Sequence, residues 1–431
     1  MKNIKLRLIL MNFFQFAVWG AYLISMGNYL GTVGMGGKIG LFYAMQGIVS
    51  LFMPALLGII ADRWIPAQRL LSLSHALAAV FMAGAGVYAL QAGDAVQFGI
   101  LFTLYSCSVA FFMPTLALSN SVAYNALDKA GLDSVKTFPS IRIFGTIGFI
   151  CSMWIVDLLG LKNSCYQFFI SAFWGLLLAV YANTLPGCPV NKVRKEKTSW
   201  IDVMGLRAFS LFKQRKMALF FIFSMLLGVS LQITNGFASP YISAFSEVEG
   251  YKDAFFAQHS VILVSISQIS ETLCILLIPF FLGRFGIKRV MLIAMFAWVL
   301  RFGFLGMGNP GAGVWLFILS MIVYGVAFDF FNISGSLFVD RETDLSMRSS
   351  AQGLFVLMTN GVGATVGTLC AQKVVNFMQH HADTLTEATH WQLADWRMSW
   401  FTFAAYALVV AVCFMILFRY KPTEENPLKK A

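Results

Sequence analysis

The sequence predicts an all-α polytopic membrane protein that crosses the bilayer twelve times. Of its 431 residues, 58% are hydrophobic and only 12% are charged, whereas soluble globular proteins have about 45–50% apolar and about 25% charged residues. The apolar residues form about a dozen blocks of roughly 20 residues, each long enough to cross a bilayer as a helix. Lys and Arg fall in the short gaps between the blocks, as residues that orient spans do. A soluble enzyme of this composition is therefore excluded.

Each apolar block is expected to be a helix, because only helices satisfy their own backbone hydrogen bonds in lipid and the blocks are too long and uniformly apolar for barrel strands. The first block has no small-residue cleavage site, so we interpret it as a retained helix. Hydropathy places the twelve spans at residues 8–30, 39–61, 70–91, 97–123, 139–160, 166–186, 217–245, 258–282, 290–307, 314–337, 351–372 and 399–418.

The charges set the predicted orientation. With the N-terminus inside, 24 Lys and Arg residues fall on the cytoplasmic side and five on the other, which is a strong positive-inside imbalance with both termini cytoplasmic. The net charge of +11 is therefore orienting charge, and no nucleic acid partner is predicted, since a DNA-binding protein concentrates its basic residues on one face. The seven cysteines show no C-x-x-C pairing, so neither a metal site nor a disulfide framework is predicted.

The longest basic gap divides the chain into two halves. An N-terminal six-helix bundle is predicted over 1–186, a cytoplasmic linker over 187–216 and a C-terminal six-helix bundle with a short cytoplasmic tail over 217–431. A faint repeat supports this division: Gly58-Ile-Ile-Ala-Asp62-Arg63 and Gly283-Arg284-Phe285-Gly286-Ile287-Lys288-Arg289 follow the second span of each half. Both resemble the G-x-x-x-D-R-x-G-R-R loop of the major facilitator superfamily. That fold implies a central site between the halves and alternating access around it.

Two basic residues, Arg142 and Arg301, fall inside predicted spans, and two acids, Glu271 and Asp329, lie well inside them. Each ionised group costs at least about 2.5–3.5 kcal/mol at the bilayer centre, so such residues face a cavity or a partner. We expect Arg301, near the outer end of its span, to reach the surface or pair with another group rather than bind substrate. The other three share helical faces with polar or aromatic side chains at spacings of three, four or seven residues. The predicted binding residues are Arg142, Thr146, Phe149, Gln232, Asn235, Gln268, Glu271, Tyr324, Phe328 and Asp329.

Carboxamides and carboxylates on these faces offer paired hydrogen-bonding groups, and the aromatic rings offer stacking surfaces. They suit a ligand with polar edges and flat faces, such as a nucleobase with a ribose. Structural explanations stay open for single residues. A lone Gln or Asn in a span is more often a contact between helices than a ligand contact, and Arg142 lies three residues after Pro139, near enough to the cytoplasmic surface to extend to it. For Glu271 and Asp329 the structural alternative is an intramembrane salt bridge.

Four strings in predicted spans 5, 7, 8 and 10 are distinctive: FPSIRIFGTIGF (138–149), FFIFSMLLGVSLQITNGF (220–237), SISQISETLCILLIPFFLGRFGIK (265–288) and SMIVYGVAFDFFNISGS (320–336). They closely resemble the bacterial nucleoside permeases of the nucleoside:proton symporter family, a branch of the major facilitator superfamily. The resemblance runs nearly end to end and implies that the ten residues above line the nucleoside site. It also implies uptake of purine and pyrimidine nucleosides, such as uridine and adenosine, with protons across the bacterial inner membrane.

The predicted mechanism couples nucleoside movement to a titrating acid. Desolvation disfavours a charged carboxylate, so Asp329 is the hypothetical proton-linked group, with Glu271 holding ribose hydroxyls and also a candidate for proton coupling. No cofactor is expected, since the proton gradient drives transport, and one chain with both halves suffices as a functional monomer. Two other classes remain alternatives: a polytopic membrane enzyme, for which no convincing catalytic cluster is found, and a carrier or exporter of another small polar, aromatic or amphipathic solute.

Overall fold

The computed structural model describes residues 3–189, 206–344, 347–383 and 391–420, and these consist of helices, turns and short connections without a strand. The described chain falls into two compact units. Unit 1 comprises Met1–Thr198, Thr234–Ser243 and Phe255–Ser265; unit 2 comprises Ser199–Ile233, Ala244–Ala254 and Ile266–Ala431. Part of the predicted linker (190–205) and the tail (421–431) lie outside the described residues. The predicted division into two six-helix bundles stays a prediction.

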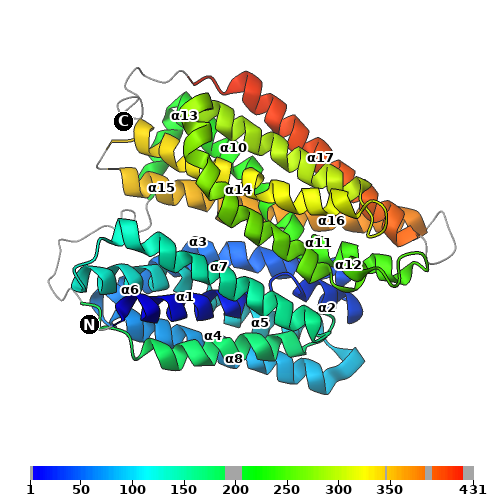
Figure 1. Cartoon of the computed structure of the whole chain (residues 1–431), viewed down its shortest axis with the longest axis horizontal. Coiled ribbons are helices and arrows are strands. Elements are labelled where there is room, and N and C mark those ends of the chain that lie inside the picture. Colours follow the sequence, from blue (N-terminus) through cyan, green and yellow to red (C-terminus); the bar gives the residue numbers. More distant parts are fainter. Residues whose placement is uncertain (1–2, 190–205, 345–346, 384–390, 421–431) are drawn as a thin grey trace. The chain divides into compact units, whose positions relative to one another are not determined.

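Unit 1 contains the first eight α-helices of the chain and two short segments from beyond the linker (Figure 1). The helices are α1 (Ile4–Gly20), α2 (Met26–Thr32), α3 (Ile39–Arg63), α4 (Ala67–Ala92), α5 (Phe98–Phe112), α6 (Thr115–Lys129), α7 (Ser134–Leu158) and α8 (Tyr166–Ala182). To these are added most of α11 (Ile233–Ala244), all of α12 (Phe255–Gln258) and the start of α13 (Ser260–Met307).

The core of unit 1 forms where α1 packs against α7 and α8, and α4 against α5 and α8. Side chains from five helices meet there without exposure to solvent, among them Leu8, Leu71, Val122, Ile141 and Leu178. The apolar stripes that make these segments insert into a bilayer therefore also pack the helices against one another.

A close approach of α1 and α7 depends on small residues. A Cβ atom at Gly148 would overlap the backbone carbonyl of Phe13, and one at Gly20 would overlap the backbone of Phe149. Small residues at such crossings let two helix backbones pack directly, which is a main source of helix association in membranes. This contact sets the position of α7, the helix that carries Arg142, Thr146 and Phe149.

Gly148→Ala is expected to destabilise the protein by about 1–3 kcal/mol, since the added methyl group overpacks this crossing. Thermal unfolding of the purified protein, followed by fluorescence-detected size exclusion, measures the effect as a lower melting temperature. Gly84→Ala is the matched control, because a Cβ there meets only an ordinary contact with Leu104 at 3.7 Å. Equal melting temperatures for the two variants would show that the crossing tolerates a side chain.

Unit 2 contains the remaining helices. Its π-helical segment η5 lies between α15 and α16, so the predicted span 351–372 is made of three consecutive helical pieces. The helices are α10 (Arg215–Leu231), most of α13, α14 (Val314–Glu342), α15 (Arg348–Val356), η5 (Leu357–Gly363), α16 (Ala364–Asp383) and α17 (Trp391–Leu417), with the 3-10 helices η3 (Leu206–Lys213) and η4 (Phe245–Glu247).

Glycines also bring α10 against η5 and α16 in unit 2. Cβ atoms at Gly228, Gly363 and Gly367 would each overlap a backbone carbonyl of the facing helix, those of Thr359, Met225 and Val229 in turn. The two crossings, α1 with α7 and α10 with η5–α16, thus use the same device in the two units.

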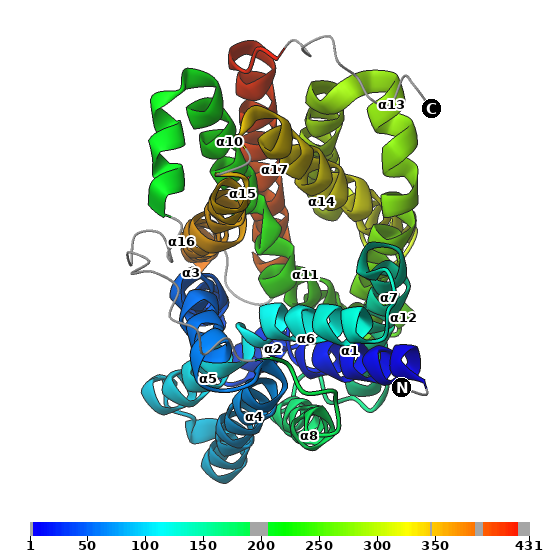
Figure 2. The same ribbon diagram turned by 90° about the vertical axis from the view of Figure 1, so that its left-hand side faces the viewer.

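The described residues contain nine helical runs that are long and apolar enough to cross a membrane, whereas the sequence predicts twelve spans. Three differences account for the count. The run Ser260–Met307 has 48 residues, about twice a membrane span, and is divided at Gly286, whose φ of 75° is non-helical. Figure 2 shows α13 turning back on itself. The helix α8 has only 17 residues, and the first predicted span is interrupted between α1 and α2. Every predicted span thus coincides with helical structure.

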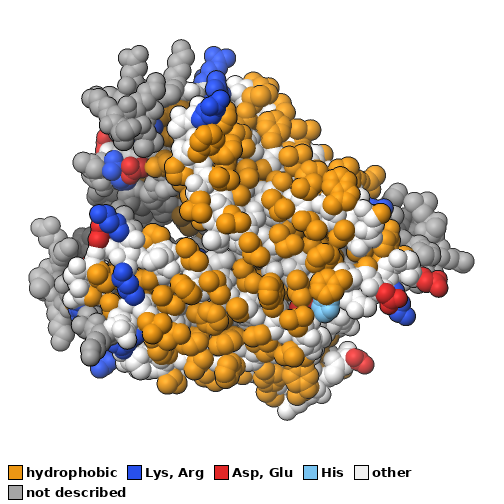
Figure 3. Space-filling view, viewed as in Figure 1, with side chains coloured by type: hydrophobic (Ala, Val, Ile, Leu, Met, Phe, Trp, Pro, Cys, Tyr) orange, Lys and Arg blue, Asp and Glu red, His pale blue; other side chains and the backbone are white. Residues whose placement is uncertain are grey.

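The surface of the helices is strongly apolar. Large hydrophobic side chains are exposed along their outer faces, with Leu276 75%, Val180 72% and Phe173 60% exposed. Apolar patches of this extent are not kept in water by soluble monomers. On the face drawn in Figure 3, hydrophobic side chains cover the middle of the helices and Lys and Arg lie near their ends. The protein is a multi-pass membrane protein.

Candidate functional site

The polar face of α7 packs against α1 in unit 1. The guanidinium carbon of Arg142 lies 3.9 Å from the centroid of the Phe16 ring, a cation–π contact worth about 0.5–2 kcal/mol. The ring of Phe149 meets that of Trp19 edge to face, with centroids 6.2 Å apart. Arg142 therefore stacks on an aromatic ring of the bundle, and Thr146 lies half-buried between it and Phe149 along the same helix.

Gln232 and Asn235 flank the break between α10 and α11. Gln232 is the residue after the last of α10, and α11 begins at Ile233. Gln232 is 9% exposed and belongs to unit 2, while Asn235 is half-buried and belongs to unit 1. The predicted pair thus stands where an apolar run is interrupted, a place where transporters expose backbone and polar groups to a ligand.

The second group of predicted residues lies on α13 and α14 in unit 2. Gln268 and Glu271 are half-buried on α13. The rings of Tyr324 and Phe328, one helical turn apart on α14, stack in parallel with centroids 5.6 Å apart and planes 6° apart. Tyr324 is only 5% exposed, whereas Phe328 is partly open. Phe328 is therefore the more exposed ring of this pair.

Asp329 follows Phe328 directly and is 5% exposed. Its carboxyl is close enough to that of Glu271 for the two groups to interact electrostatically. Among the described residues, its Oδ2 atom has no hydrogen-bond partner. Two acidic groups in one apolar environment repel each other when both are charged, and a shared proton relieves that repulsion.

Arg301 is a residue of this group that the sequence analysis set aside. It is 1% exposed, and its guanidinium carbon lies 4.3 Å from the centroid of the Tyr324 ring. Its Nη1 donates hydrogen bonds to the Ser267 hydroxyl at 3.2 Å and to the backbone carbonyl of Ser320 at 2.9 Å. The expectation that Arg301 reaches the surface is wrong, and the alternative that it pairs with other groups is confirmed, because it joins the α13 segments on both sides of Gly286 to α14.

The structure therefore brings the predicted residues together in two groups. Unit 1 holds Arg142, Thr146, Phe149 and Asn235; unit 2 holds Gln232, Gln268, Glu271, Tyr324, Phe328 and Asp329. That all ten line a single site stays a prediction. The sequence did not distinguish Phe16 and Trp19 from the other aromatic residues of a chain with 42 Phe and 10 Trp residues. Only their spacing of three residues indicated that the two rings share one face of the first span.

Comparison with known proteins identifies the family. The family described as "Nucleoside H+ symporter" matches residues 1–423. The xanthosine permease of Escherichia coli (strain K12) is 46% identical over 98% of both chains, and the nucleoside permease NupG of the same organism is 45% identical over 97% of both.

Solved structures agree with the relatives. A crystal structure of the nucleoside transporter NupG superposes with a TM-score of 0.86 at 44% identity, covering 97% of this chain and 100% of the other. The xylose transporter XylE from E. coli, at 12% identity and a TM-score of 0.60 over 96% and 98% of the chains, shows the shared fold alone. The fold is that of the major facilitator superfamily. The chain thus belongs to the nucleoside–proton symporter family, and the protein is a membrane transporter of nucleosides rather than an enzyme.

Proposed function

We propose that the protein imports both purine and pyrimidine nucleosides together with protons across the bacterial inner membrane, with both termini in the cytoplasm. The names of the relatives, a xanthosine permease and a nucleoside permease, support a substrate range that includes purines. The proton gradient supplies the energy without a cofactor, and one chain is the functional unit. The excess of basic residues in the predicted cytoplasmic loops supports the orientation.

The observation that carries this proposal is the group on α13 and α14. A half-buried aromatic ring, Phe328, stacks on Tyr324 and directly precedes Asp329 in α14, and the carboxyl of Asp329 interacts with that of Glu271. A nucleobase stacks on an aromatic ring with a gain of about 1–3 kcal/mol, and charged carboxylates accept strong hydrogen bonds from ribose hydroxyls. A nucleoside has both features, whereas a sugar lacks the flat ring and a free base lacks the hydroxyls.

The remaining predicted residues complete the proposed site. Arg142, held on the Phe16 ring, donates to carbonyl oxygens of the base, and Thr146 offers a hydroxyl on the same face. Phe149 offers a second aromatic surface. The carboxamides of Gln232, Asn235 and Gln268 read the edge of the base with paired donors and acceptors. Asp329 carries the proton, because its carboxyl is the more buried of the two interacting acids: Asp329 is 5% exposed, whereas Glu271 is half-buried.

Uptake into proteoliposomes tests this proposal. With the interior alkaline, we expect radiolabelled uridine to accumulate above its external concentration, and a protonophore to abolish that accumulation. Unlabelled adenosine and uridine are expected to compete, while uracil and ribose compete poorly because each offers only half of the recognised features. Accumulation that ignores the pH gradient would contradict proton coupling. Equal competition by ribose or by an amphipathic dye would contradict nucleoside selectivity and favour a carrier for another solute.

A further inference from the structure

A buried ion pair lies in unit 1 at the end of α7, away from the proposed nucleoside residues. Asp157 occupies the last turn of α7 and is 1% exposed, and Lys162, in the turn that leads to α8, is 7% exposed. The Lys162 Nζ atom lies 3.8 Å from Asp157 Oδ1. Taking both charges out of water costs several kcal/mol per ion, so such a pair persists only where further hydrogen bonds hold it.

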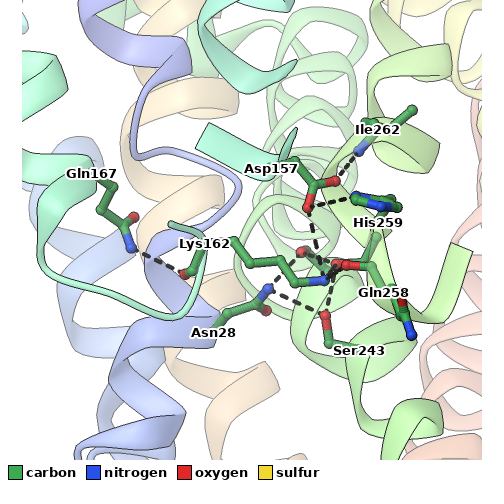
Figure 4. Close-up of polar contacts among 10 residues, drawn as sticks. Asn28, Asp157, Lys162, Gln167, Ser243, Gln258, His259 and Ile262 are labelled. Carbon is green, nitrogen blue, oxygen red and sulfur yellow. Dashed lines mark hydrogen bonds and ion pairs between the residues drawn. The ribbon is translucent and has the colours of Figure 1, made fainter. Parts of the chain in front are cut away.

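Those further bonds all lead to the segment where α13 begins. The second carboxylate oxygen of Asp157 accepts a hydrogen bond from the backbone N–H of Ile262 at 2.9 Å. Lys162 donates to the backbone carbonyl of Gln258 and lies 3.5 Å from the Ser260 hydroxyl. Figure 4 shows the carboxylate of Asp157 and the ammonium of Lys162 converging on this segment. The ion pair therefore fastens the α7–α8 turn to the first turn of α13.

Two more contacts of the same kind surround the pair. Trp154, one turn before Asp157, donates from its indole nitrogen to the Ser265 hydroxyl at 2.9 Å. The His259 Nδ1 atom lies 3.7 Å from Asp157 Oδ1. Three side chains of the α7–α8 region thus contact five backbone or side-chain groups near the start of α13.

A hydroxyl cluster extends the same connection to α2. The Asn28 side chain donates to the hydroxyls of Ser239 at 3.1 Å and Ser243 at 3.3 Å, both on α11. These two hydroxyls lie 2.8 and 2.7 Å from that of Ser260. Residues before the predicted linker thus bind residues after it through a continuous polar network. We call this network the α7–α13 joint. Its members are Asn28, Trp154, Asp157, Lys162, Ser239, Ser243, Gln258, His259, Ser260, Ile262 and Ser265.

The joint connects two helices that carry proposed binding residues. The helix α7 bears Arg142, Thr146 and Phe149, and α13 bears Gln268 and Glu271 two to three turns after Ile262. An apolar contact at this place would strongly resist opening, because separation exposes hydrocarbon to water. An ion pair behaves differently: when the joint opens, water solvates both charges and replaces the bonds that are lost. The pair therefore favours the closed state without the large free-energy cost of opening that an apolar contact would impose.

We propose that Asp157 and Lys162 are positioning residues of the transport cycle: they fasten α7 to the start of α13, and this joint opens and re-forms in every cycle. The proposal rests on the transport function given above. The groups that Asp157 and Lys162 bind belong to this chain, and the nucleoside takes no part in the joint.

Alkylation of two native cysteines measures opening of the joint without any substrate. Cys165 lies three residues beyond Lys162, whereas Cys188 lies elsewhere in unit 1 and is also buried. Burial raises the pKa of both thiols, so neither reacts readily until it is exposed. In Asp157→Asn/Lys162→Gln, which removes both charges without adding an apolar contact, we expect Cys165 of the purified protein to react roughly tenfold faster. Cys188 should react at an unchanged rate, as measured by mass spectrometry of the two peptides.

Other variants and readouts separate positioning from simple folding. Asp133→Asn is the matched control, because it breaks an exposed pair with Lys136, with side chains 50% and 85% exposed, and should change neither thiol. Asp157→Asn alone strands a buried ammonium and should be less stable than the double variant. Uridine binding to the purified double variant should stay within about twofold while the maximal uptake rate changes several-fold.

Three results would overturn the proposal. A folded double variant in which Cys165 reacts at the wild-type rate would show that the pair does not hold the joint closed. Parallel acceleration at Cys165 and Cys188 would show general loosening of the unit. Normal uptake by the double variant would show that the cycle does not use the joint. The alkylation result is independent of the substrate, so it stands or falls separately from the proposed nucleoside import.

Discussion

Asp329→Asn is expected to abolish the accumulation of nucleosides driven by a pH gradient while leaving exchange of labelled for unlabelled nucleoside across the membrane. Asparagine keeps the size of the side chain and some of its hydrogen bonding but cannot gain or lose a proton. Asp329 is 5% exposed and its carboxyl interacts with that of Glu271, so its charged form is costly. Binding of a proton to Asp329 therefore depends on the charge of Glu271 and on the bound nucleoside. Proteoliposomes loaded with uridine measure exchange, and empty ones with an imposed gradient measure accumulation.

The matched control for this variant is Asp340→Asn on the same helix. Asp340 has a side chain that is 44% exposed and pairs with Arg348 at 2.8 Å. An exposed pair contributes about 0–1 kcal/mol, so accumulation should be unchanged. Gradient-driven accumulation by the Asp329 variant would assign the proton to another group, with Glu271 the first to be examined. Loss of exchange together with accumulation would show instead that Asp329 is required for binding.

Arg301→Lys is expected to lower the ratio of maximal uptake rate to KM by on the order of tenfold or more. The guanidinium of Arg301 lies over the Tyr324 ring and also donates to Ser267 and Ser320. Lysine has no planar group to cover the ring and cannot reach the same partners with a fixed geometry. A hydrogen bond to a charged group contributes about 1.5–3 kcal/mol, and 1.4 kcal/mol corresponds to a factor of ten. Initial rates of uridine uptake over a concentration series measure the effect.

Arg289→Lys is the control for the arginine variant, because Arg289 is exposed near the turn of α13. It should transport as the wild type does. The amount of each variant in the membrane and its melting temperature must be measured alongside, since Arg301 also joins helices. A normal uptake ratio for Arg301→Lys would mean that the residue only packs α13 against α14 and does not shape the Tyr324 ring for the ligand.

The positions of the membrane spans follow closely from hydropathy, because the bilayer imposes one simple requirement on every span. Breaks within spans do not follow from it. The interruption between α1 and α2, the end of α10 at Leu231 and the π-helical segment η5 all lie inside spans that hydropathy predicts as continuous. Local packing against neighbouring helices determines them, and a hydropathy window averages over that information.

The candidate site could be predicted where polar groups interrupt apolar sequence, as with Glu271 and Asp329. Position along a span proved a poor guide to burial. Arg301 lies toward the end of a span, yet its partners on two other helix segments keep it 1% exposed. Lys162 is one of the five basic residues predicted on the side opposite the cytoplasm, yet the structure buries it against Asp157. Both were misjudged for the same reason: a partner far away in sequence decides whether a charge is solvated.

In each predicted half the chain reverses direction once between the second and third helix, and the two turns use different residues. Between α3 and α4 the chain turns at Pro66, with φ −53° and ψ 138°, directly before α4 begins at Ala67. Within α13 it turns at Gly286, with φ 75° and ψ 167°. Proline cannot adopt a positive φ, and a residue with a Cβ atom is strained at one, so the proline of the first turn could not serve in the second. If the two halves descend from a duplicated ancestor, both have kept the position at which the backbone reverses, whereas the residue that makes the reversal has changed.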